Sequence, residues 1–217
     1  MSESVHILGP QFSNFVRSVQ WCCEEKGIPY TLGFELEGAP LEFGGEKHRT
    51  LHPFAKVPVL LHGERCLFET APICRYLDAN FDGPELQPHA PWQRAEVDQW
   101  SQALSGYVDQ ALVRRFLLEF VFPKGEGGSI RKERVEQATP EVVRMLNLLE
   151  RQLEGHAYLV GEAFSMADAI LAPMLDYLDG LPAGKPLMAE NPALESYLQR
   201  LRQRESSRRV LVPPQIG

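Results

Sequence analysis

The sequence has few cysteines, no excess of basic residues and no long apolar run. Its four cysteines form no C-x-x-C pair and no metal-ligand spacing, so we expect reduced, mostly buried thiols and no metal site. A formal net charge of −7 argues against a nucleic-acid-binding protein. No apolar stretch is long enough to cross a membrane, which argues against a membrane protein.

The chain is long enough to bury a sizeable core. Its 217 residues are 44% hydrophobic and 24% charged, which is ordinary for a globular protein of one large domain or two small ones. The opening Met-Ser-Glu-Ser-Val-His lacks the basic and apolar regions of a secretory signal. Together with the expected reduced thiols, this predicts a cytoplasmic protein.

A β-hairpin is predicted near the middle of the first half of the chain. Two apolar runs, 57–61 and 66–68, flank the turn sequence His-Gly-Glu-Arg. Pro58 lies inside the first run, where a proline gives the sheet no N–H donor. A cis peptide bond after Val57, placed where a ligand meets the backbone, would explain a proline at this position.

A helix is predicted directly after the hairpin. Glu69 and Thr70 precede Ala-Pro-Ile-Cys-Arg-Tyr-Leu, and the helical pattern reaches about Asn80. The free N–H groups and the positive end of the helix dipole make such a helix start a natural site for a carboxylate. The sequence therefore predicts a carboxylate-binding site beside the hairpin.

The predicted elements follow the order β-α-β-α-β-β-α, which is the order of a thioredoxin-like domain. Besides the hairpin and its helix, they are a strand at 5–8, a helix from Phe15 to a stop at Gly27, a strand at 30–36 and a short irregular helix at 46–51. A segment rich in proline and glycine, 83–90, predicts a linker. We therefore assign residues 1–82 to this domain.

Residues 91–217 are predicted to form a second, all-helical domain, which makes the fold class α+β followed by all-α. Its helices are expected at 91–120, 131–153, 165–178 and 192–205. Ser165 and Asp168 have the spacing of a capping box. Asp168 is therefore expected to be a buried structural residue at a helix start.

Two motifs in this order resemble the glutathione S-transferase superfamily. The first is Lys-Val-Pro-Val-Leu at 56–60 with Glu-Thr at 69–70, and the second is Leu-Val-Gly-x-x-Phe-Ser-x-Ala-Asp at 159–168. The resemblance covers nearly the whole chain. It implies a homodimeric detoxification enzyme, a glutathione transferase that attaches the thiolate of glutathione to a small hydrophobic electrophile.

The resemblance also implies how glutathione, the co-substrate, is bound. The bond before Pro58 would be cis, and the backbone of Val57 would pair with the cysteinyl part of glutathione. Glu69 and Thr70 would hold the γ-glutamyl end.

Several side chains are candidates for binding the glycyl end of glutathione. Lys56 would bind its carboxylate, or else it is a solvated loop lysine. Relatives often carry a lysine or histidine where this chain has Gly44. The resemblance therefore implies weaker glycyl binding, or binding by one of three neighbours: Lys47, His48 or Arg49.

The sulfur of glutathione is reactive only as a thiolate, so the site needs a donor that stabilises the anion. Ser13 precedes Arg17 by four residues, as in the serine-type theta and zeta classes. The resemblance implies Ser13 as the catalytic donor, with its neighbour Asn14 as the alternative. From the residues alone, a helix cap is the simpler interpretation of Ser13. Arg17 would add positive potential or serve as a surface or interface charge.

The second domain is expected to supply an apolar wall for the electrophile. Candidates for lining its pocket are Phe12, Phe15, Tyr107, Arg114 and Phe116, although aromatic residues at helical spacing are more often core. Two other functions remain open. One is glutathione-dependent dehalogenation, peroxide reduction or isomerisation on the same site, and the other is a non-catalytic ligand-binding or interaction protein.

Overall fold

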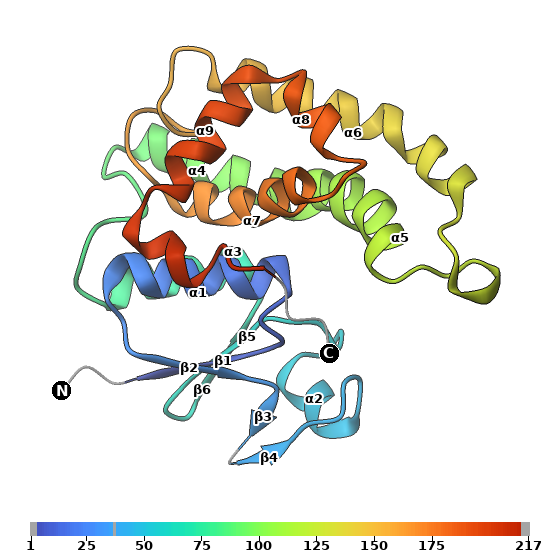
Figure 1. Ribbon diagram of the computed structural model, residues 1–217. Coiled ribbons are helices and arrows are strands. Elements are labelled where there is room, and N and C mark those ends of the chain that lie inside the picture. The colour runs from blue at the N-terminus through green and yellow to red at the C-terminus, as the bar shows by residue number, and fades with distance from the viewer. Residues whose placement is uncertain (1–3, 37, 214–217) are drawn as a thin grey trace.

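The apolar strand near the start of the chain lies inside a four-stranded sheet in the computed structural model, which describes residues 4–36 and 38–213 (Figure 1). The sheet has the order β2-β1-β5-β6, with β1 at Val5–Leu8, β2 at Tyr30–Gly33, β5 at Val59–His62 and β6 at Arg65–Phe68. β1 pairs in parallel with β2 and antiparallel with β5, and β5 and β6 form the predicted hairpin. Because a parallel pair needs a crossover, helix α1, Asn14–Lys26, connects β1 to β2.

Two helices separate this sheet from the rest of the molecule. α1 and α3, Thr70–Asn80, pack together between the sheet and the helical region, while the short α2, Glu46–Leu51, lies near the end of the sheet (Figure 1). Both α2 and α3 have the bounds that the sequence predicted. The order of elements is that of a thioredoxin-like domain, as expected.

The strand predicted at 30–36 is wrong in its second half. β2 ends at Gly33, and the next strand, β3 at Glu35–Leu36, pairs instead with β4 at Ala39–Pro40. The ring of Phe34 packs against Phe43 and His48, with ring centroids 5.7 and 5.1 Å apart. The side chain at the break therefore belongs to an aromatic cluster and not to the sheet.

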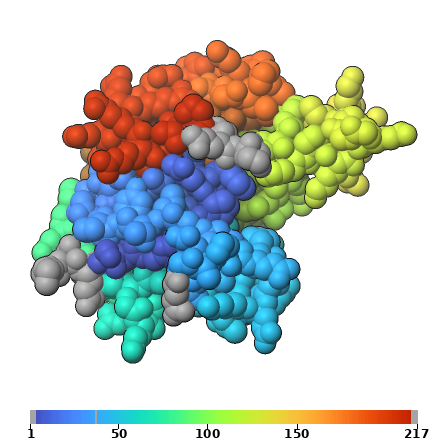
Figure 2. All heavy atoms as spheres, turned by 60° about the horizontal axis from the view of Figure 1, so that its bottom comes forward, coloured from blue at the N-terminus to red at the C-terminus, as the bar shows by residue number. Residues whose placement is uncertain are grey.

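The second half of the chain is helical. Its α-helices are α4 at Pro91–Ala103, α5 at Leu118–Val121, α6 at Lys132–Leu153, α7 at Met166–Gly180, α8 at Lys185–Ala189 and α9 at Pro192–Arg202. Short 3₁₀ turns occur at Glu126–Gly128 (η2) and Glu205–Arg209 (η3). The chain between α5 and α6 projects from the body of the molecule, in yellow-green in Figure 2. The sequence did not predict α8.

The helix predicted at 91–120 is continuous but not uniformly α-helical. Leu104–Leu117, segment η1, is wound as a π-helix between α4 and α5. π-helical winding is uncommon and frequently occurs at functional sites. This segment changes which side chains share a face of the helix.

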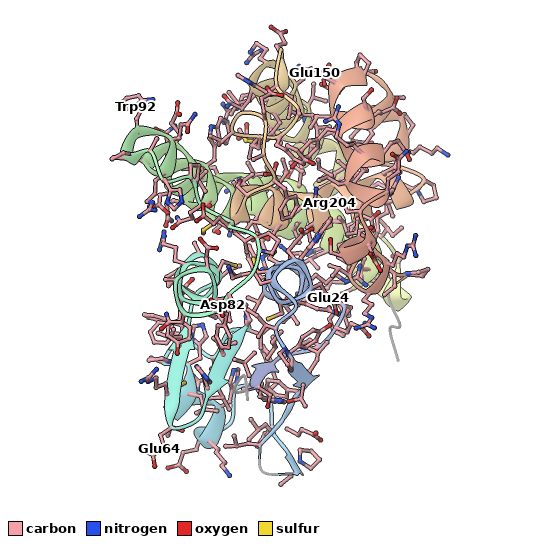
Figure 3. The ribbon with its side chains drawn as sticks, turned by 90° about the vertical axis from the view of Figure 1, so that its left-hand side faces the viewer. Glu24, Glu64, Asp82, Trp92, Glu150 and Arg204 are labelled. Atoms are coloured by element: carbon pink, nitrogen blue, oxygen red, sulfur yellow. The ribbon has the colours of Figure 1, made fainter. Side chains whose placement is uncertain are left out.

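Helix α7 is the centre of the helical region and also joins it to the sheet domain. Every residue from Met166 to Leu175 is buried, as expected for a helix that is apolar all round. α7 lies against α1, directly above it in Figure 1. Figure 3 shows the same layering from the side, with Glu64 at the tip of the hairpin, Glu150 at the far end, and Glu24 below Arg204 at the junction.

The capping box at the start of α7 is confirmed. Asp168 is fully buried, and its carboxylate accepts hydrogen bonds from the backbone N–H of Ser165 at 2.7 Å and of Leu159 at 2.9 Å. It also accepts from the hydroxyl of Tyr197 at 2.8 Å. Asp168 therefore joins α7, α9 and the preceding loop.

The segment between the two regions is tightly held. α3 ends at Asn80 and α4 begins at Pro91, and the predicted linker at 83–90 falls between them. Leu86 is 1% exposed, its N–H donates to Asp78 Oδ1 at 2.8 Å, and its carbonyl accepts from the N–H of Met166 at 2.9 Å. These contacts fix the position of the helical region on the sheet domain.

All four cysteines are free thiols. Cys22, Cys23 and Cys74 are buried, whereas Cys66 is exposed at the hairpin. Among the residues that the structure describes, we find no helix with the length and hydropathy needed to cross a bilayer.

Candidate active site

The loop between β1 and α1 brings Ser13 beside the segment at Val57. Gly9 has a φ of 153°, and a Cβ there would lie 2.4 Å from Val16 Cγ2 and 3.2 Å from Val57 Cβ. Only glycine allows so close an approach. Ser13 is the N-cap residue of α1, but its hydroxyl makes no capping hydrogen bond. The hydroxyl thus lies at the helix N-terminus without being used to hold the helix.

Two side chains, those of Arg17 and Tyr177, donate hydrogen bonds to carbonyl groups of this loop. Arg17 Nε donates to the carbonyl of Gln11 at 2.9 Å. Its Nη2 donates at 2.8 Å to the carbonyl of Val212, which lies outside the loop, near the end of the chain. The Tyr177 hydroxyl, from α7, donates to the carbonyl of Phe12 at 2.7 Å.

The burial of Arg17 rules out the surface or interface charge that was one of the two roles considered for it. The side chain is fully buried, and its guanidinium stacks on Tyr177, 4.6 Å from the ring centroid. Burial lowers the pKa of this guanidinium. Arg17 is therefore a positioning residue for the loop and not a surface or interface charge.

Asn14 connects the start of α1 to the helical region. It is 5% exposed, and its Nδ2 donates to Asp109 Oδ1 at 3.1 Å. The second oxygen of Asp109 accepts from Arg114 Nε at 2.7 Å. Burial raises the pKa of Asp109, against the opposing effect of Arg114 and of the hydrogen bond from Asn14.

The segment before the hairpin has the predicted geometry. The peptide bond between Val57 and Pro58 is cis, and β5 begins only after the proline, at Val59. The carbonyl of Lys56 lies 2.9 Å from His48 Nε2, while His48 Nδ1 accepts from the N–H of Gly44 at 3.0 Å. Because Nδ1 is the acceptor, Nε2 carries the proton and donates to Lys56.

The three neighbours considered for the glycyl end do not line the hollow described below. His48 is fully buried, with its ring against Phe34 and Phe43 and both ring nitrogens bonded to backbone groups. Arg49 donates from Nε to the carbonyl of Gly44 at 2.9 Å, and Lys47 lies on the outer face of α2. Lys56 does line the hollow.

Glu69 and Thr70 stand at the start of α3. Glu69 is the N-cap residue and has a φ of 71°, a backbone conformation that residues other than glycine rarely adopt. Such backbone costs about 1–3 kcal/mol and tends to occur at binding sites. Thr70 is 5% exposed and begins the helix.

The sequence-predicted residues meet in two adjoining hollows. The smaller, of about 340 Å³, is lined by Ser13, Phe15, Phe43, His52, Lys56, Val57, Pro58, Glu69, Thr70, Ser105, Gln110 and Arg114. Six of the seven predicted site residues lie here, and the seventh, Asn14, lines the larger hollow. Polar and ionic groups dominate the smaller one, which suits a small charged peptide.

The larger hollow, of about 590 Å³, is mostly apolar. Its lining comprises Pro10, Phe12, Ser13, Asn14, Phe34, Phe43, Val57, Val113, Arg114, Leu117, Leu118, Val121, Phe122 and Tyr177. Of the five predicted electrophile-pocket residues, Phe12 and Arg114 lie in it, and Phe15 lies in the smaller hollow. Tyr107 and Phe116 lie in neither, because Tyr107 is 76% exposed and Phe116 is buried in the core.

Comparison with known proteins places the chain in one family. Residues 9–85 match the model of the glutathione S-transferase N-terminal domain, and residues 132–200 match that of the C-terminal domain. A probable glutathione S-transferase of Solanum tuberosum is 30% identical, in an alignment that covers 76% of this chain and 69% of the relative. The chain belongs to the glutathione S-transferase family. The comparisons thus bear out the expected fold and enzyme class, a glutathione transferase.

Other relatives agree with this assignment. Glutathione S-transferase F10 of Arabidopsis thaliana is 29% identical, and the alignment covers 82% of each chain. The crystal structure of a theta-class glutathione S-transferase from Xanthomonas axonopodis pv. citri, with glutathione bound, superposes with a TM-score of 0.84. The two chains are 29% identical, and the superposition covers 97% of this chain and 98% of the Xanthomonas chain.

Three residues that lie in or beside the two hollows were not singled out from the sequence: His52, Asp109 and Tyr177. His52 lines the smaller hollow, is 2% exposed, and burial lowers its pKa. Its signal was present, since it precedes Pro53 where relatives often carry asparagine. Asp109 and Tyr177 gave no local signal, because each acts on a residue far away in the chain.

Proposed function

We propose that this chain is a serine-type glutathione transferase that binds glutathione in the smaller hollow and an apolar electrophile in the larger one. The observation that carries the proposal is the place of Ser13, which lines both hollows at the N-terminus of α1. A sulfur anion on the border between the hollows would accept a hydrogen bond from the Ser13 hydroxyl and would be stabilised by the dipole of α1. Stabilisation of the thiolate makes it available as the nucleophile.

Ser13 is favoured over Asn14 as the donor to sulfur. The amide of Asn14 is already bonded to Asp109, and its side chain is buried. The hydroxyl of Ser13 has no capping bond to give up. In this proposal Asn14 positions the start of α1, and Ser13 contacts the reacting atom.

Glutathione would lie extended between the two helix starts. The carboxylate of Glu69 would pair with the α-ammonium of the γ-glutamyl group, and the Thr70 hydroxyl with the α3 N–H groups would bind its carboxylate. The backbone of Val57 before Pro58 would pair with the cysteinyl part. Lys56 supplies the only cationic side chain from the sheet domain among the described lining residues, so we assign it to the glycyl carboxylate.

We further propose that the transferase is a cytoplasmic homodimer that acts in detoxification. Phe54 is 69% exposed and Tyr107 is 76% exposed, and aromatic side chains are enriched in protein interfaces. Free thiols support a reducing compartment. The oligomeric state is tested by sedimentation at several concentrations.

The catalytic assignment is tested with Ser13→Ala and Asn14→Ala. Loss of one preorganised donor typically costs about 10²–10³ in rate. Ser13→Ala should therefore lose most turnover of 1-chloro-2,4-dinitrobenzene, keep its retention on immobilised glutathione, and move the pH profile of kcat upward. If only Asn14→Ala moves that profile, the donor is Asn14 and Ser13 is a helix cap.

A further inference from the structure

Arg114 lies where the two hollows meet. Only four of the described residues line both: Ser13, Phe43, Val57 and Arg114. In the proposed function, Ser13 and Val57 contact the cysteinyl part of glutathione. Arg114 therefore faces the space in which the sulfur meets the electrophile.

The guanidinium of Arg114 is the single charged group among the described residues that line the larger hollow. The other polar groups there are neutral, and they belong to Ser13, Asn14 and Tyr177. Arginine remains protonated at every physiological pH. A guanidinium edge that faces an apolar hollow favours a ligand with an anionic group at the matching place.

The guanidinium is held in place by one edge and leaves the other edge open. Its Nε donates to Asp109 Oδ2 at 2.7 Å, and its Cζ lies 5.8 Å from the ring centroid of Phe15. Within the part of the chain that the structure describes, neither Nη atom has a hydrogen-bond partner, and the side chain is 43% exposed. Asp109 is only 3% exposed, so a ligand meets the guanidinium and not the carboxylate.

We propose that the electrophile taken by this transferase carries a carboxylate, which the two Nη groups of Arg114 bind. This inference rests on the proposed function and names the substrate class of the same site. A planar carboxylate matches the two parallel N–H donors of a guanidinium edge. The apolar body of the substrate would fill the larger hollow beside it.

The reaction of a suitable probe is a simple substitution. With 4-chloro-3-nitrobenzoate, the thiolate of glutathione attacks the ring carbon that bears chlorine. The S–C bond forms, the C–Cl bond breaks, and chloride leaves with the bonding electron pair. The thiol proton has already gone to solvent, and the carboxylate is unchanged.

The test compares this probe with its neutral carboxamide, 4-chloro-3-nitrobenzamide. For each enzyme variant we take the ratio of kcat/KM for the acid to kcat/KM for the amide, so that differences in intrinsic reactivity cancel between variants. Hydrogen bonds to a charged group are worth about 1.5–3 kcal/mol, so Arg114→Gln should lower this ratio by about 10- to 150-fold. Arg114→Lys keeps the charge but loses the two parallel donors of the guanidinium edge, and should give an intermediate ratio.

Arg115→Gln is the matched control. Arg115 is the next residue of η1, is exposed, and lines neither hollow. Its ratio should equal that of the wild type. Melting temperatures of all three variants show whether each one is folded.

A binding measurement separates this inference from the proposed function. Fluorescence titration with 2-naphthoate and 2-naphthamide needs no turnover, and only the acid should lose affinity in Arg114→Gln. If Arg114→Gln lost affinity equally for the acid and the amide and also bound glutathione more weakly, Arg114 would be a residue that binds glutathione. That result would overturn the proposal. An unchanged ratio with unchanged naphthoate binding would overturn it as well. A wild type that fails to bind glutathione would refute the proposed function, while naphthoate binding would still decide the role of Arg114.

Discussion

Asn14 and Asp109, 95 residues apart in the chain, are joined by a buried hydrogen bond of 3.1 Å from Nδ2 to Oδ1. The same carboxylate binds Arg114 five residues further along η1. In an α-helix, neighbours on one face are three or four residues apart, whereas π-helical hydrogen bonds join residues five apart. The π-helical winding therefore brings Asp109 and Arg114 together.

Removal of this carboxylate should weaken both the fold and the site. Asp109→Ala leaves the amide of Asn14 and Nε of Arg114 without their acceptor, so the free energy of unfolding should fall by about 1–3 kcal/mol. Urea unfolding measures the loss, and kcat should fall with it. Asp98→Ala is the control, because Asp98 pairs with Arg75 at the surface, where an ion pair is worth about 0–1 kcal/mol. Equal losses in the two variants would contradict a special role for Asp109.

Glu69 offers a way to separate binding from stability. Glycine adopts a φ of 71° without strain, so Glu69→Gly should keep or raise the melting temperature while it removes the carboxylate. The KM for glutathione should rise by about 10-fold or more, as expected for the loss of a charged hydrogen bond. Glu69→Gln keeps the strained backbone and should weaken binding without the gain in stability. An unchanged KM in both variants would remove Glu69 from the site.

Asp168 should be essential for stability and not for chemistry. Asp168→Ala would leave the N–H groups of Leu159 and Ser165 and the hydroxyl of Tyr197 without an acceptor. Each buried group left unsatisfied costs about 1–3 kcal/mol, so unfolding free energy should fall by about 3 kcal/mol or more. Ser165→Ala should cost only about 1 kcal/mol as a lost cap. Full stability with lost turnover would show that the structural assignment is wrong.

Glu25 should make stability depend on pH. Burial alone would raise the pKa of its carboxyl, but the guanidinium of Arg204 with the hydroxyl of Ser206 lowers it below the ordinary 4.5. A lowered pKa in the folded state stabilises the protein above the unfolded pKa, and this contribution is lost as pH falls through the folded pKa. The melting temperature of the wild type should therefore exceed that of Glu25→Gln at pH 7, and the difference should shrink below about pH 4.5. Calorimetry from pH 3 to 7 measures it, and a constant difference would contradict the assignment.

Local sequence patterns were enough to predict the elements whose ends are set by neighbouring residues. Helix α3 begins at Thr70 and ends at Asn80 as expected, because a hydroxyl opens it and the apolar spacing stops there. Ser13 and Glu69 were placed in one site by a resemblance that covers both, and the structure brings them to one hollow.

The features that the sequence did not reveal depend on contacts between distant segments. Arg17 was expected to add positive potential or to be a surface or interface charge, because arginine is rarely buried. It is instead buried, and its partners are the carbonyl groups of Gln11 and Val212. The Asp109–Arg114 pair was hidden because an α-helical period places residues five apart on different faces. No pattern of hydrophobic spacing distinguishes π-helical from α-helical winding over so short a segment.

The bond from Tyr177 to the carbonyl of Phe12 has a consequence for how the molecule unfolds. Helix α7, from the other half of the chain, supplies this hydrogen bond to the loop that presents Ser13. The same helix packs against α1, which follows the loop. Separation of the two halves would strip the loop of a partner and expose apolar surface on both sides. We therefore expect the N–H of Ser13, which donates to the carbonyl of Pro10, to exchange with solvent mainly when the two halves of the chain separate.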